Sequence, residues 1–174
     1  PKVVAKYLVT SARIVYKFEW QREVGLQVYV DTDFAACMQT CKSTSGGCIL
    51  RGGRTLKHWS STQKTVTLSS GAAELAGLVK GAGQALGMQS LAADLGVRVD
   101  IRLYADSSAA IGICHRNGIG RVRHLAVNQL WVQGMLQAGA LALHKVPGEE
   151  NPADVLTKHV GRDILDRHNP DVTQ

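Results

Sequence analysis

The chain has 174 residues, of which 45% are hydrophobic, with a formal charge of +6 at pH 7 and a pI of about 9.3. This length suits one ordinary domain with a real core, and no stretch approaches the roughly 18–20 unbroken apolar residues of a membrane helix. The basic residues are dispersed, so the charge is compatible with a polyanionic partner such as nucleic acid but does not by itself indicate one.

The first 21 residues predict a helix over about 2–12, followed by an extended piece at 15–20. Lysines interrupt the apolar residues and no small-residue cleavage site follows, so the segment is not a signal peptide. The chain begins at Pro1 rather than Met, from which we expect a piece of a longer protein. A polar break at 21–23 is the candidate domain boundary.

Strands dominate the next part of the chain. Alternating β-branched and aromatic residues predict strands at 26–30, 43–50 and 56–61. Gly52 and Gly53, between the second and third strands, are typical of a hairpin turn. This third of the chain is therefore expected to form an antiparallel meander.

The pattern then changes to alternating helices and strands. Ser69 and Ser70 can cap a helix that Gly96 ends, although its four internal glycines weaken it by up to ~1 kcal/mol each relative to alanine. The remaining expected elements are a strand at 99–105, helices at 107–114 and 124–137, a strand at 141–146, and a last helix at 152–158. With right-handed crossovers, this order predicts an α/β fold with a mixed five-stranded sheet, three antiparallel strands then two parallel, flanked by helices.

Four acidic residues fall where these elements begin or end. Asp31 and Asp106 follow strands, and Glu74 and Asp154 lie near the starts of helices. Because the carboxyl ends of parallel strands line one crevice, the four carboxylates can converge there. Each also has an ordinary structural explanation, either a favourable place at a helix N-terminus or a turn after a strand.

The four cysteines, at 37, 41, 48 and 114, form no C-x-x-C pair and no zinc-ligand spacing. They are expected to be reduced thiols of an intracellular protein.

The segments around the four acids resemble the ribonuclease H domain of copia-type retrotransposon Pol polyproteins. The matching segments, in chain order, are 29–35 (YVDTDFA), 42–46 (KSTSG), 59–70 (WSSTQKTVTLSS), 73–76 (AELA), 104–107 (YADS) and 152–158 (PADVLTK). Residues 1–21 are similar to the end of the reverse transcriptase connection segment in those polyproteins. The resemblance therefore implies a ribonuclease H-like domain over 22–168 and a tail over 169–174.

This resemblance implies a metal-dependent endonuclease that hydrolyses the RNA strand of RNA/DNA hybrids during reverse transcription. Asp31 would bridge two Mg²⁺ ions, for which Mn²⁺ can substitute, Glu74 and Asp106 would hold one ion, and Asp154 the other. The implied substrate-binding residues are Ser107, Arg123 and His124, although Ser107 can equally cap its helix and His124 can be a surface residue. The implied partners are the hybrid and the reverse transcriptase domain of the same polyprotein. Location would be cytoplasmic, in a retroelement particle, or nuclear.

Some positions depart from the family pattern. Ala72 replaces an acid, Leu75 replaces an aromatic residue and Phe34 replaces a tryptophan. The loop at 147–151 lacks the histidine that many ribonucleases H carry there. These departures leave open a catalytically inactive domain that binds nucleic acid or supports the polymerase. DNA strand transfer on the same fold is a third alternative, but it typically uses a D-D-E order of acids rather than the D-E-D-D order found here.

Overall fold

The computed structural model describes residues 9, 15–16, 20, 25–118, 120, 129–161, 163–164 and 172–173. The chain divides into two units, Pro1–Gln21 with Val160–Gln174, and Arg22–His159. In the first unit, β1 (Val15–Tyr16) pairs antiparallel with β7 (Val172–Thr173). Of the helix expected over 2–12, the structure describes residue 9 alone. The assignment of 1–21 to a connection segment and of 169–174 to a tail stays a prediction.

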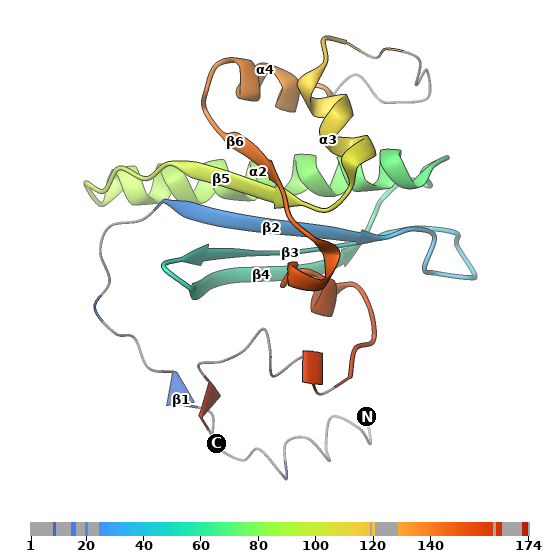
Figure 1. The fold of residues 1–174 in the computed structure, drawn as a ribbon, viewed down its shortest axis with the longest axis horizontal. Helices are drawn as coiled ribbons and strands as arrows, with labels where there is room; N and C mark the ends of the chain where they lie inside the picture. Colours follow the sequence, from blue (N-terminus) through green and yellow to red (C-terminus); the bar gives the residue numbers. More distant parts are fainter. Residues whose placement is uncertain are drawn as a thin grey trace. The chain divides into compact units, whose positions relative to one another are not determined.

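A five-stranded mixed sheet is the centre of the second unit (Figure 1). Its strands are β2 (Leu26–Asp33), β3 (Thr44–Arg51), β4 (Arg54–Thr62), β5 (Ile101–Ala105) and β6 (Ala142–Lys145). They lie in the order β4-β3-β2-β5-β6, in which β3 pairs antiparallel with both β4 and β2, β5 pairs parallel with β2, and β6 pairs parallel with β5. The predicted α/β architecture, three antiparallel strands followed by two parallel ones, is confirmed.

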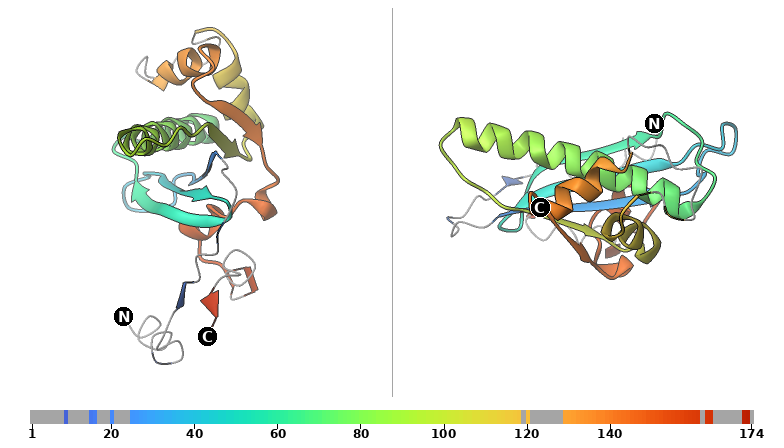
Figure 2. Two further views of the ribbon diagram at one scale, coloured as in Figure 1. Left: turned by 90° about the vertical axis from the view of Figure 1, so that its left-hand side faces the viewer. Right: turned by 90° about the horizontal axis from the view of Figure 1, so that it is seen from above.

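Three helices, α2 (Ser70–Asp94), α3 (Ser108–His115) and α4 (Trp131–Gln137), lie on one side of the sheet (Figure 2). Their buried residues pack with alternate residues of the strands, such as Val28 and Leu103, into one hydrophobic core. The start of the helix expected near 124 falls on residues that the structure does not describe. Among the described residues, no helix is both long enough and apolar enough to cross a membrane.

Two of the glycines in α2 face β2 rather than solvent. A Cβ at Gly77 would lie 2.5 Å from Thr32 Oγ1, and a Cβ at Gly81 would collide with Val30 Cγ1. At Gly83, by contrast, nothing lies within 4 Å of the Cβ position. The sequence predicted a helix weakened by its glycines, whereas Gly77 and Gly81 allow its backbone to approach the strand that carries Asp31.

The last helix, expected over 152–158, is instead a 3-10 turn, η3 (Asp154–Leu156), which a second 3-10 turn, η2 (Gly148–Glu150), precedes. Backbone N–H groups of Leu156 and Thr157 donate to carbonyls three residues earlier, at 3.0 and 3.2 Å, which is the 3-10 pattern. The segment is short and tied at both ends to β2, by Asn151 to Val30 O and by Thr157 to Asp31. These tertiary ties hold the backbone of the segment in the tighter 3-10 geometry.

Two glycine-to-alanine changes on α2 separate the close approach from helix propensity. Gly81→Ala should lower the free energy of unfolding by about 1–3 kcal/mol, because the added methyl group overpacks against Val30. Gly83→Ala, with open space around it, should raise it by up to ~1 kcal/mol. Urea unfolding of both variants measures the difference, and equal effects of the same sign would contradict a close contact between α2 and β2.

Candidate metal centre

Three carboxylates from three different elements meet at one edge of the sheet. Asp31 lies near the carboxyl end of β2, Asp106 directly follows β5, and Glu74 lies in the second turn of α2. Because β2 and β5 are parallel neighbours, their carboxyl ends lie side by side. One oxygen from each of the three residues lies within 4.8 Å of the others. The structure therefore brings three of the four predicted acids together.

The surroundings of the cluster disfavour the ionised forms of Glu74 and Asp106. Asp31 is 2% exposed. Burial, followed by repulsion from Asp31 and then from Asp106, raises the pKa of Glu74 to about 8. Burial and the charge of Asp31 also raise the pKa of Asp106. In the absence of a cation, the cluster therefore holds a proton near neutral pH.

The donor set fits a hard divalent cation. Mg²⁺ binds carboxylate oxygen atoms, usually only a few from the protein, and keeps water or substrate oxygen atoms for its other positions. Asp31, Glu74 and Asp106 supply such oxygens, and the repulsion that raises the pKa of Glu74 is what a bound cation would relieve.

The fourth predicted acid, Asp154, lies outside this three-residue group. It opens η3, and its Oδ1 pairs with the ammonium group of Lys158, four residues later. Burial and the charge of Asp31 are the main causes of the raised pKa of Asp106, and the negative charge of Asp154 also raises it, as the smallest cause. Its proximity to the cluster follows from that interaction, while its role as a metal ligand stays a prediction.

The sequence reasoning gave no role to Asn151, which fixes the position of η3. Its side chain is 1% exposed, donates from Nδ2 to Val30 O at 2.9 Å and accepts from Ala153 N at 3.1 Å. Gly46 on β3 leaves room for this turn, since a Cβ there would lie 2.6 Å from the methyl group of Thr157. The available signal was a polar residue directly before Pro152 and the apolar Ala153.

The predicted substrate-binding residues have different outcomes. Ser107 is the N-cap of α3, where its hydroxyl accepts from Ala110 N at 3.3 Å. This confirms its capping role, whereas contact with substrate stays a prediction. Arg123 and His124 lie outside the described residues.

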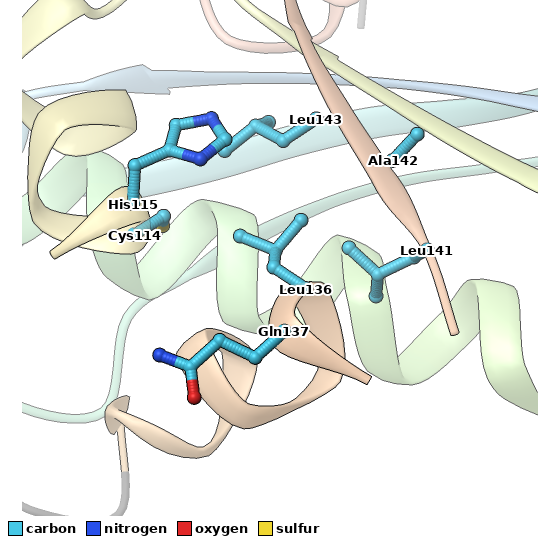
Figure 3. Close-up of a pocket in the computed structure, with 7 residues that line it drawn as sticks. All are labelled: Cys114, His115, Leu136, Gln137, Leu141, Ala142 and Leu143. Carbon is cyan, nitrogen blue, oxygen red and sulfur yellow. The ribbon is translucent and has the colours of Figure 1, made fainter. Parts of the chain in front are cut away.

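A pocket of about 400 Å³ lies elsewhere, between α3, α4 and β6 (Figure 3). It is lined by Cys114, His115, Leu136, Gln137, Leu141, Ala142 and Leu143. None of the four predicted acids lines it, so the candidate metal centre and this pocket are separate.

The comparisons with known proteins point to one relationship. No protein-family model matches the chain. It is 30% identical over 139 residues to the retrovirus-related Pol polyprotein from transposon TNT 1-94 of Nicotiana tabacum, which covers 79% of this chain and 10% of that protein. It is 28% identical over 164 residues to that of transposon RE1 of Arabidopsis thaliana, covering 92% of this chain and 11% of that protein.

Solved structures share the fold. LC11-RNase H1, isolated from compost, superposes with a TM-score of 0.52 at 16% identity, over 82% of this chain and 96% of that chain. The N-terminal RNase H domain of Rv2228c from Mycobacterium tuberculosis superposes with a TM-score of 0.50 at 20% identity, over 84% and 97%. The chain has the ribonuclease H fold, and its relatives are retrovirus-related Pol polyproteins.

That relationship confirms the one predicted from the sequence motifs. The ribonuclease H-like chain spans about a tenth of the length of the curated relatives it matches. Among the solved structures, LC11-RNase H1 is also known in complex with an RNA/DNA hybrid, with a TM-score of 0.50 at 18% identity over 75% of this chain and 92% of that chain.

The raised pKa of Glu74 makes the stability of the metal-free protein depend on pH. The pKa is about 8 in the folded state and 4.5 ordinarily, so the folded state binds the proton more tightly. The stabilisation is complete below about 4.5 and is lost as the pH rises to about 8, so the free energy of unfolding falls across that window.

Urea unfolding in EDTA between these pH values measures the slope. Glu74→Gln should flatten it, whereas the control Glu149→Gln, at an exposed glutamate of η2, should follow the wild type. A wild-type slope that Glu74→Gln leaves unchanged would contradict the assignment.

Proposed function

We propose that this chain is a metal-dependent endonuclease that hydrolyses the RNA strand of RNA/DNA hybrids, in the course of retroelement reverse transcription. The observation that carries the proposal is the convergence of Asp31, Glu74 and Asp106 at one sheet edge of a ribonuclease H fold. The hybrid bound to LC11-RNase H1 supports the choice of substrate.

Each residue of the centre would have a defined part. Asp31, which is buried, would be a ligand for both of two Mg²⁺ or Mn²⁺ ions. Glu74 and Asp106 would help to hold one of them, and Asp154 the other. Two such ions supply an activated water and stabilise the charge that develops on the phosphate and on the leaving oxygen. The protein itself would contribute the fixed placement of the carboxylate oxygens, which parallel β2 and β5 and the close packing of α2 provide.

The alternative is a catalytically inactive ribonuclease H-like domain that binds nucleic acid or supports the polymerase. The carboxylates favour the enzyme. All four acids stand in the segments that resemble the family, and three of them cluster, which a domain that only supports the polymerase does not require. The implied partners, the hybrid and the reverse transcriptase domain of the same polyprotein, belong to this proposal, as does a cytoplasmic or nuclear location.

Cleavage of a labelled RNA/DNA hybrid with Mg²⁺ or Mn²⁺ tests the proposal. The wild type should cut the RNA strand and leave duplex DNA and duplex RNA intact. Asp31→Asn should reduce the rate by about 100-fold or more, since it removes a charge from the reacting centre. The matched control is Asp100→Asn, an exposed aspartate directly before β5 and therefore at the opposite edge of the sheet, which should cut like the wild type.

Two results would contradict the enzyme. One is a folded wild type that binds the hybrid without cutting it, even with the upstream polymerase supplied, which favours the inactive alternative. The other is equal cutting by wild type and Asp31→Asn, which would place the activity in a contaminant or another site.

A further inference from the structure

The ammonium group of Lys158 lies among the carboxylates of the candidate metal centre. It pairs with Asp154 Oδ1, and it lies 3.7 Å from Asp31 Oδ2. Both ion pairs that the described residues make with these two acids therefore come from a single lysine. The structure thus already holds one positive charge between two carboxylates that the proposed function assigns to metal binding.

The position of Lys158 is fixed by the turn that carries it. Its backbone N–H donates to Asp154 O at 3.1 Å, and the preceding Thr157 hydroxyl donates to Asp31 Oδ2. Asn151 ties the start of the same turn to Val30 O. Two consecutive residues, Thr157 and Lys158, therefore both contact one oxygen of Asp31, and the backbone beneath them is anchored to β2.

The two sides of this ion pair differ in exposure. The side chain of Lys158 is 46% exposed, whereas that of Asp31 is 3% exposed. A lysine ammonium is a compact charge on a flexible four-carbon stem, which can leave a carboxylate for water at modest cost. Asp31, in contrast, cannot leave its site. The lysine is therefore the member of the pair that can move when another cation binds.

We propose that Lys158 is a tethered counter-cation, which neutralises Asp31 and Asp154 in the metal-free protein and competes with divalent cations for these two residues. The proposal rests on the proposed function only in that the same carboxylates bind the metal. Binding of a cation to Asp31 and Asp154 would then require the ammonium group to move away, so that Lys158 sets the metal concentration at which the site fills. It acts through the carboxylates and is a positioning residue.

The substitutions Lys158→Gln and Lys158→Arg should change the affinity for metal in opposite directions. Lys158→Gln removes the competing charge, so metal should bind more tightly while the metal-free protein loses a stabilising pair. Lys158→Arg keeps the charge and can form two parallel hydrogen bonds to a carboxylate, so it should compete more strongly and weaken metal binding. A residue that served only to hold the turn in place would weaken metal binding in both variants.

Calorimetric titration of the full chain with Mg²⁺ and with Mn²⁺ measures the dissociation constants. That of Lys158→Gln should fall at least about fivefold relative to wild type, the factor for one unit charge at ~4 Å even in bulk water. The unfolding midpoint of this variant in EDTA should fall by roughly 2–4 °C, the shift expected for a lost interaction of this size. Lys158→Arg should give a larger dissociation constant than wild type.

The matched control is Lys57→Gln, which removes the same charge from an exposed lysine of β4. It should bind metal like the wild type, which separates the local effect from the change in net charge. Equal or weaker binding by Lys158→Gln, or no binding by either protein, would overturn the inference. Lys158→Arg keeps the pair and should fold, so tighter metal binding by this variant would overturn it even where the glutamine variant does not fold.

Hybrid cleavage is scored separately. If the wild type cuts no hybrid but the variants show these affinity shifts, the result supports the role of Lys158 and contradicts the proposed function. If the wild type cuts the hybrid but the Lys158 variants bind metal with the wild-type affinity, the result supports the proposed function and contradicts the role of Lys158.

Discussion

Repulsion between carboxylates held at a fixed spacing is the constraint on which the rest of the site depends. Oxygens of Asp31, Glu74 and Asp106 lie within 4.8 Å of one another, in surroundings that are buried enough to raise the pKa of Glu74 to about 8. Such a cluster costs stability unless a proton or a cation compensates it. A fold selected for stability alone has no reason to assemble it, and this is the physical basis for assigning function to this edge of the sheet.

The surrounding structure holds the carboxylates together against this repulsion. Parallel pairing of β2 and β5 fixes the spacing of Asp31 and Asp106, and the glycines of α2 bring Glu74 close to β2. On the other side of Asp31, the η3 segment is anchored through Asn151 and brings Lys158 to the cluster. A proton on Glu74 and the ammonium group of Lys158 are therefore two compensations within the metal-free protein, and a divalent cation would replace both.

Much of this arrangement could be predicted from the sequence. The order of strands and helices gave the mixed sheet, and the rule that parallel strands share a carboxyl edge was sufficient to bring Asp31 and Asp106 together. The η3 turn could not be predicted, because the hydrogen bond from Asn151 to Val30 O crosses 121 positions of the chain. For the same reason the contact of Lys158 with Asp31 could not be predicted, and the glycines of α2 were expected only to weaken the helix.

The most direct test of the central claim is a crystal structure of the chain grown with Mn²⁺, with anomalous scattering used to locate the ion. The account predicts an anomalous peak between Asp31, Glu74 and Asp106, with carboxylate oxygens from all three within a few tenths of an ångström of the ~2.0–2.1 Å that is typical of Mg²⁺. A well-ordered structure with these three residues in place and Mn²⁺ bound only elsewhere, or not at all, would contradict the assignment of this edge as a metal centre.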